Sequence, residues 1–127
     1  MFSEREMVEA LRELLAAERA GARAATACLA LAQSSDEREQ LQQLHQREVD
    51  SCRALLACLI HLGVTPGNDV GEFYNKVIAL DTLDERLLLI DKGQRWVLRR
   101  VELLLANTDD ESIRAELELV RCHHQAE

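Results

Sequence analysis

The sequence predicts an all-α protein, a four-helix bundle in which two antiparallel hairpins are joined by a crossover that contains a short helix. Leu, Ala, Glu and Arg dominate the 127 residues, aromatic residues make up only 3%, and there is a single proline. This composition favours helices over sheets, which need β-branched and aromatic residues and frequent turns. Apolar residues recur at steps of three and four along four long segments, as they do on the buried face of a helix.

Residue pairs of the capping-box type mark where the predicted helices begin. In this motif an N-cap side chain accepts a hydrogen bond from the backbone N–H three residues on, and a Glu at that position accepts one from the N-cap N–H. The pairs are Ser3/Glu6, Ser34/Glu37, Asp69/Glu72, Thr82/Glu85 and Thr108/Glu111. Each precedes an apolar periodic run, so together they predict helices over about residues 4–33, 35–62, 70–80, 83–106 and 109–126.

The predicted connections are of two kinds: two short loops that form hairpins, and one long link between the hairpins. The loops near residues 34 and 107 are short, so each should join two antiparallel helices. Gly63 is placed to end the second helix, and a Pro-Gly turn follows it. The link over residues 63–82 could span roughly 35–40 Å, about the length of the bundle. This length indicates a crossover along the side of the bundle, which is the topology of ferritin-like folds. The length of the chain indicates a single domain over residues 1–127.

Charge and hydropathy argue against several classes of protein. The net charge is −8, and no block of Lys and Arg stands apart from acidic neighbours, so we expect no nucleic-acid binding. The start, MFSEREMVEA, has no basic region leading into an apolar stretch, which argues against a signal peptide. No apolar run approaches the roughly 20 residues that span a bilayer. We therefore expect a cytoplasmic protein without membrane contacts.

A polar side chain stands on or beside the apolar stripe of every long predicted helix. In the stretch LLAAERAGARAA, Glu18 falls where the pattern calls for leucine. Glu48 takes a stripe position in the second long helix, with His45 one turn before it. The third and fourth long helices contribute Asp91, Gln94, Glu116, His123 and His124.

Counted from the hairpin turns, these polar positions come to one height. Glu18 and Glu48 are almost equally far from the first turn, so in an antiparallel pair they face each other within about 3 Å of axial height. The prediction is a shared central layer formed by Glu18, Glu48, Asp91 or Gln94, and His123 or His124. Which histidine faces the core stays open, because adjacent residues are about 100° apart on a helix.

Such a layer is suited to a metal ion, although two alternatives remain. An isolated ionised carboxylate is costly to bury, whereas two carboxylates and an imidazole can hold one Fe, Mn or Zn ion. The candidate ligands are Glu18, Glu48, His123, His124, Asp91 and Gln94. His45 and Glu116 are candidates for residues that contact and orient these ligands. The layer could instead be structural, with carboxylates paired to arginines and helix register fixed by the polar contacts. It could also hold a small organic ligand.

Two mid-helix glycines lie near the same height. Gly21 and Gly93 each cost about 1 kcal/mol relative to alanine in a helix interior. We expect this cost to be offset by a close approach of helices or by space for a bound group.

Several stretches resemble a small uncharacterised bacterial family that is grouped with ferritin-like bundles. They are LLAAERAGARAA, LGVTPGNDVGEFYNKVIAL, LLLIDKGQRWVLRRVELLL and the HH pair near the end, and they cover most of the chain. The resemblance implies a ferritin-like fold and no established activity. The chain is also similar, more broadly, to the ferritin and rubrerythrin superfamily, where a Glu on the first and third helices and a Glu-x-x-His on the second and fourth hold two irons. By position, Glu18 matches the first-helix ligand and Glu48 the second-helix glutamate.

The chain departs from that superfamily pattern at three of its helices. Ser51 stands where a histidine should follow Glu48, Gln94 or Asp91 replaces the third-helix glutamate, and no Glu-x-x-His occurs near the terminal histidines. A full di-iron site needs about four carboxylates and two histidines, so a site for one metal ion, or a remnant that binds nothing, fits better, and we expect no iron storage. If the protein is an enzyme, we expect a metal-dependent oxidoreductase. The alternative is a metal-free bundle acting as an interaction or oligomerisation module, and we expect a homodimer.

Overall fold

The computed structural model describes residues 1–125, and this part of the chain is all-helical. Its elements are α1 (Glu4–Leu29), α2 (Ser35–His61), α3 (Phe73–Ile78), α4 (Leu83–Leu105) and α5 (Glu111–Gln125). The all-α prediction is confirmed. The predicted end of the last helix, at residue 126, lies outside the described residues. None of the helices in the described part is long and apolar enough to cross a membrane.

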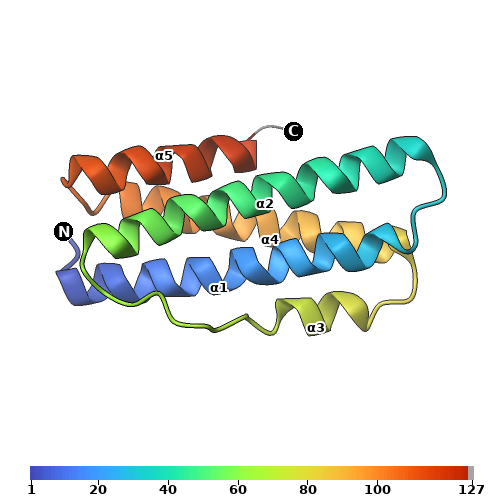
Figure 1. The fold of residues 1–127 in the computed structure, drawn as a ribbon, viewed down its shortest axis with the longest axis horizontal. Helices are drawn as coiled ribbons and strands as arrows, with labels where there is room; N and C mark the ends of the chain where they lie inside the picture. Colours follow the sequence, from blue (N-terminus) through green and yellow to red (C-terminus); the bar gives the residue numbers. More distant parts are fainter. Residues whose placement is uncertain (126–127) are drawn as a thin grey trace.

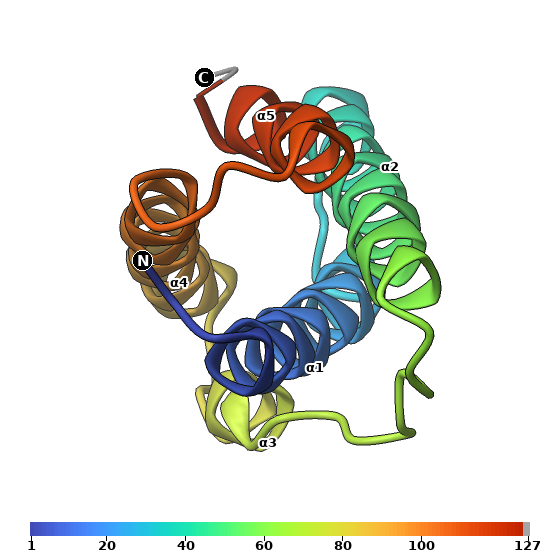
Figure 2. The same cartoon turned by 90° about the vertical axis from the view of Figure 1, so that its left-hand side faces the viewer.

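The four long helices lie side by side around a common core, and α3 covers the outside of α1 and α4 (Figure 1). Figure 2 shows α1 between α2 and α4, with α5 closing the ring on the opposite side. Helices α1 and α5 run in one direction and α2 and α4 in the other (Figure 1). The segment between α2 and α4 therefore travels along the side of the molecule before α4 begins.

Three of the predicted helix starts carry the expected caps. Ser3 and Glu6 form a complete capping box at the start of α1. The side chains of Ser34 and Thr82 accept hydrogen bonds from backbone N–H groups three residues on, at the starts of α2 and α4. These starts depend only on neighbouring residues, which explains why the local pattern predicts them.

The predicted start of the short helix at Asp69 is wrong. Helix α3 begins only at Phe73, and no side chain caps it. The backbone before it is bound to α1 instead, because Gly71 N–H donates to the Ala16 carbonyl at 3.3 Å and Arg19 donates to the Asp69 carbonyl at 3.3 Å. Contacts with another helix therefore replace the expected first turn.

Two further predicted helix bounds are corrected by local hydrogen bonding. Helix α1 ends at Leu29 instead of residue 33, since Leu31 N–H closes a turn of the 3₁₀ type on the Cys28 carbonyl at 2.9 Å. Helix α5 begins at Glu111 because the carboxylate of Asp110, and not the Thr108 hydroxyl, accepts from the first free N–H groups of the helix.

Gly63 ends α2 as predicted. Its φ of 72° lies in the left-handed region, which glycine adopts without the penalty of a Cβ atom. Gly63 N–H donates to the Ile60 carbonyl at 2.9 Å and Val64 N–H to the Leu59 carbonyl at 3.1 Å. This pair of bonds is the Schellman motif, and it satisfies carbonyls that the end of a helix leaves free.

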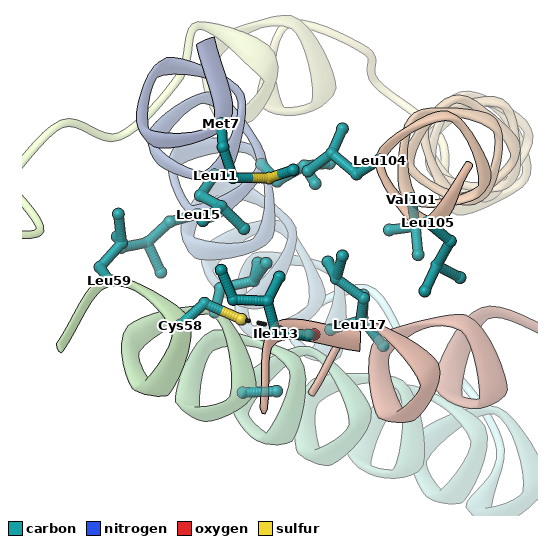
Figure 3. Close-up of a cluster of buried hydrophobic side chains, with 14 of the residues drawn as sticks. Met7, Leu11, Leu15, Cys58, Leu59, Val101, Leu104, Leu105, Ile113 and Leu117 are labelled. Atoms are coloured by element: carbon teal, nitrogen blue, oxygen red, sulfur yellow. Dashed lines mark hydrogen bonds between the residues drawn. The ribbon is translucent and has the colours of Figure 1, made fainter. Parts of the chain in front are cut away.

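Two apolar clusters fill the core. The larger one is drawn in Figure 3 and is built from α1, α2, α4 and α5, with Leu11, Leu59, Leu104 and Leu117 among its buried members. The smaller one contains Ala24, Ala25, Cys28, Leu41, Leu44, Val77 and Ile90. Along each long helix a polar residue follows or separates the two clusters, so the polar layer lies where the apolar packing is interrupted.

Arginine side chains tie the crossover to the helices beneath it. Arg12 Nε donates to the Thr65 carbonyl at 3.0 Å, and Arg19 Nη1 donates to the Gly67 carbonyl at 3.0 Å. These bonds hold the coil before α3 along α1.

Gly93 lets α3 approach α4 closely. A Cβ atom at this position would lie 2.9 Å from the Phe73 ring, so no larger residue fits without moving that ring. Close packing of α3 on α4 therefore offsets the helix-propensity cost of this glycine. It is one of the two compensations expected from the sequence.

Candidate metal centre

Polar side chains from all four long helices meet at the middle of the molecule. Glu18 of α1, Glu48 of α2 and His124 of α5 each offer one ligand atom, and these three atoms lie within 4.8 Å of one another. The residues are only 1%, 2% and 7% exposed. Gln94 of α4 completes the group, because its side-chain amide donates to Glu48 Oε1. Four of the predicted candidates are therefore brought together.

Gly21 makes room for the carboxylate of Glu48. It lies on α1 one turn after Glu18, and a Cβ atom there would stand 2.9 Å from Glu48 Cδ and 3.0 Å from Glu48 Oε1. The glycine thus lets a carboxylate from α2 sit against the backbone of α1. Sequence analysis placed this glycine near the layer but did not assign its neighbour.

The orientation of the His124 ring leaves its Nε2 atom free for a ligand. Its Nδ1 atom lies 2.8 Å from the Val120 carbonyl, which can only accept, so Nδ1 carries the hydrogen. In the neutral ring, Nε2 then has a lone pair, and it lies 3.2 Å from Glu18 Oε2. A backbone carbonyl that holds the far nitrogen is the usual support for a metal-binding histidine.

The cluster has a shortage of hydrogen-bond donors. Within residues 1–125, Glu18 Oε2, Glu48 Oε2 and His124 Nε2 are buried and have no hydrogen-bond partner. Lone pairs that face one another away from water are unfavourable unless a proton or a cation lies between them.

Burial changes the acidity of both carboxyl groups. Desolvation raises the pKa of Glu18 to about 7, although the neighbouring polar groups of Glu48 and Ser51 act in the opposite direction. Desolvation, and after it the charge of Glu18, raises the pKa of Glu48 well above its ordinary value, while His124 and Gln94 oppose this rise. Below about pH 7, protons therefore keep the pair largely neutral when no cation is bound, and a cation would have to displace them.

His124, and not His123, is the histidine that faces the cluster. His123 is half-buried, and its Nδ1 lies 2.8 Å from Ser51 Oγ, outside the group of convergent ligand atoms. Burial lowers the pKa of His123. Ser51 itself is fully buried. The sequence did not predict its contact with His123. Its position three residues after Glu48, on the same helical face, was the available signal.

The remaining candidates lie outside the cluster. The Asp91 carboxylate forms an ion pair with Arg95 at 2.9 Å and is partly exposed. His45 lines a surface hollow together with Arg23 and Tyr74. Glu116 is half-buried on α5 and is not among the three convergent ligands.

A cavity of about 590 Å³ opens between α1, α3 and α4 and reaches the cluster. Glu18, Glu48 and Gln94 line it together with Phe73 and Trp96. Because both glutamates are almost completely buried, they form its inner end. A small solute in this cavity would therefore lie next to the covered carboxylates.

These features define an all-helical protein with a buried Glu/Glu/His cluster between its four long helices. The model of one protein family, described as a domain of unknown function (DUF6306), matches residues 5–127, and the chain belongs to this family. No curated protein and no solved structure matches the chain. The function must therefore be argued from the site itself.

Proposed function

We propose that the protein binds one divalent transition-metal ion, Fe, Mn or Zn, through Glu18, Glu48 and His124. The observation that carries this proposal is the meeting of three buried acceptor atoms without a donor, all within 4.8 Å of one another. Two carboxylates balance the charge of a divalent ion, and carboxylate and imidazole ligands suit these three metals. The metal would thereby remove the cost of burying the cluster.

Neighbouring groups support each proposed ligand. The Gln94 amide orients Glu48, and the Val120 carbonyl orients the His124 ring. Such partners fix ligand geometry and raise affinity. Three protein ligands leave coordination positions open, and a bound metal would supply Lewis-acid or redox chemistry to a solute in the adjoining cavity.

A degenerate ferritin-like bundle is the architecture we propose for this centre. It is supported by the parallel course of α2 and α4 and the long crossover between them (Figure 1). A single ion is supported by the ligand set, since residues 1–125 contain no second group of three or more Asp, Glu, His or Cys side chains with convergent ligand atoms.

Elemental analysis of untagged protein, expressed with iron, manganese and zinc supplied, tests the proposal. We expect about one ion per chain in the wild type and in His123→Ala, and loss of the metal in His124→Ala and in Glu18→Ala/Glu48→Ala. The two neighbouring histidines form a matched pair, because only His124 faces the cluster. Absence of metal from the wild type, or equal loss in both histidine variants, would overturn the proposal.

The alternative is a metal-free bundle whose polar layer is structural and whose outer faces bind a partner or a second copy. Two observations favour it: the raised pKa of Glu18, which permits a neutral acid near pH 7, and the bond from Gln94 to Glu48. Exposed Leu88 and Ile60 would supply apolar contact surface. A wild type that contains no metal but forms dimers in sedimentation experiments would support this alternative.

A further inference from the structure

The cavity between α1, α3 and α4 combines apolar walls with a cationic rim. Its walls include the apolar side chains of Ala17, Phe73, Leu89, Trp96 and Val97. Lys76 of α3 and Lys92 and Arg99 of α4 also line it, and all three are exposed. A cavity of about 590 Å³ lies within the range that holds small organic ligands.

The cationic rim is unusual for this chain. The net charge is −8, and Lys76 and Lys92 are the only lysines in the sequence. Among the described residues, Lys76, Lys92 and Arg99 take part in no ion pair and in no side-chain hydrogen bond. Positive charge on an otherwise acidic protein attracts and retains anions.

Two acidic residues, Glu13 and Glu72, also line the cavity at the rim. Glu13 pairs with Arg100 at 2.8 Å, and Glu72 accepts a hydrogen bond from Asn75 at 3.1 Å. The guanidinium of Arg100 also lies over the Trp96 ring, 5.5 Å from its centre. Arg100 neutralises Glu13, whereas the neutral Asn75 leaves the charge of Glu72 in place. The three unpaired cations therefore outnumber the one remaining carboxylate at the rim, and they are the groups available to an anionic ligand.

We propose that this cavity binds a small organic acid, with its carboxylate at the cationic rim that Lys76, Lys92 and Arg99 provide and its apolar body between Phe73 and Trp96. The body of the ligand would then lie along the apolar walls, between the rim and the carboxylates at the inner end of the cavity. Apolar walls favour such a body over a sugar or a free inorganic anion, because burying polar groups without partners is costly. The inference deepens the proposed metal centre and rests on it for any chemistry that follows binding.

Octanoate and its uncharged analogue octanamide are suitable probes. Trp96 is the only tryptophan of the chain and lines the cavity, so its fluorescence reports occupancy. We expect octanoate to bind about tenfold more tightly than octanamide to the wild type. The variant Lys76→Gln/Lys92→Gln/Arg99→Gln should bind octanoate about tenfold more weakly, as the loss of several partly exposed charge pairs implies.

A control variant of equal charge is Arg5→Gln/Arg38→Gln/Arg53→Gln, whose sites are exposed and lie outside the cavity. It should bind octanoate as the wild type does. Equal affinity for both probes, equal affinity in the two triple variants, or no binding of octanoate by fluorescence and calorimetry would overturn the proposal. Circular dichroism confirms that each variant is folded.

Metal analysis of the same samples separates this inference from the proposed function. The variant Lys76→Gln/Lys92→Gln/Arg99→Gln should keep its metal while its affinity for octanoate falls. This result would support both the metal centre and the ligand cavity. Octanoate binding that depends on the rim in a wild type without metal would contradict the metal centre and support the ligand cavity.

Discussion

Glu18 Oε2 and His124 Nε2 lie 3.2 Å apart in the interior of the protein, and neither atom is satisfied by a hydrogen bond in the described structure. The Val120 carbonyl takes the hydrogen on His124 Nδ1, so two lone pairs face each other unless a proton or a metal ion separates them. This contact joins α1 to α5, helices that otherwise face each other across the apolar core. The stability of the metal-free protein and its metal affinity should therefore depend on the same few atoms.

Replacing Glu18 by leucine should stabilise the metal-free protein. Glu18→Leu removes a desolvated carboxyl group and continues the apolar stripe, so we expect the free energy of unfolding in the presence of a chelator to rise by about 1–3 kcal/mol. Urea denaturation measures this change. Glu9→Leu on the exposed side of α1 is the control and should bring no comparable gain. A less stable Glu18→Leu protein would show that the carboxyl group contributes favourably without a metal.

The metal-free protein should lose stability as the pH rises from about 5 to 8. Folded Glu18 keeps its proton up to a pKa of about 7, whereas the unfolded side chain releases it near 4.5. The folded state binds more protons in that interval, so its stability is fully present below pH 4.5 and falls through pH 7, by up to about 3 kcal/mol. Urea unfolding at several pH values with EDTA measures the slope, which Glu18→Gln should reduce. An increase in stability over the same interval contradicts this expectation.

Gly21→Ala should weaken metal binding. A Gly-to-Ala change in a helix interior normally stabilises by about 1 kcal/mol, but here the new Cβ would lie 2.9 Å from Glu48 Cδ. Displacing Glu48 should lower metal affinity by about tenfold or more, as measured by competition with a chromophoric chelator. Gly93→Ala is the matched control, because its Cβ meets the Phe73 ring instead. Unchanged affinity in Gly21→Ala would contradict the expectation that metal binding needs the close approach of Glu48 to the backbone of α1.

Gln94→Ala should lower metal affinity without changing the number of ions bound at saturation. The Gln94 amide orients Glu48 and is not itself one of the three convergent ligands, and loss of such a partner typically costs 10–100-fold in affinity. Gln43→Ala, which removes an exposed amide on α2, should leave affinity unchanged. Equal affinities in the two variants would contradict the supporting role of Gln94.

Local sequence patterns were sufficient for much of the secondary structure. The apolar repeat predicts all four long helices, and Ser3, Ser34 and Thr82 predict three starts, because a cap needs only residues within one turn. The predictions fail at Asp69 and Thr108, where other partners compete. Gly71 binds the backbone of α1, and Asp110 caps α5 in place of Thr108. At Asp69 the competing partner is another helix, which comes close only when the chain folds. At Thr108 the competing cap is a nearby polar residue, Asp110.

The candidate site divides in the same way. Helical rise and two short hairpin loops place Glu18 and Glu48 at one height, so their meeting follows from the sequence pattern alone. The choice of His124 over His123 and the contact of Ser51 with His123 depend on the rotation of each helix about its axis. That rotation is set by packing across the whole core. Periodicity near a stripe edge therefore identifies the helix that supplies a side chain to the cluster, while tertiary packing selects which side chain it is.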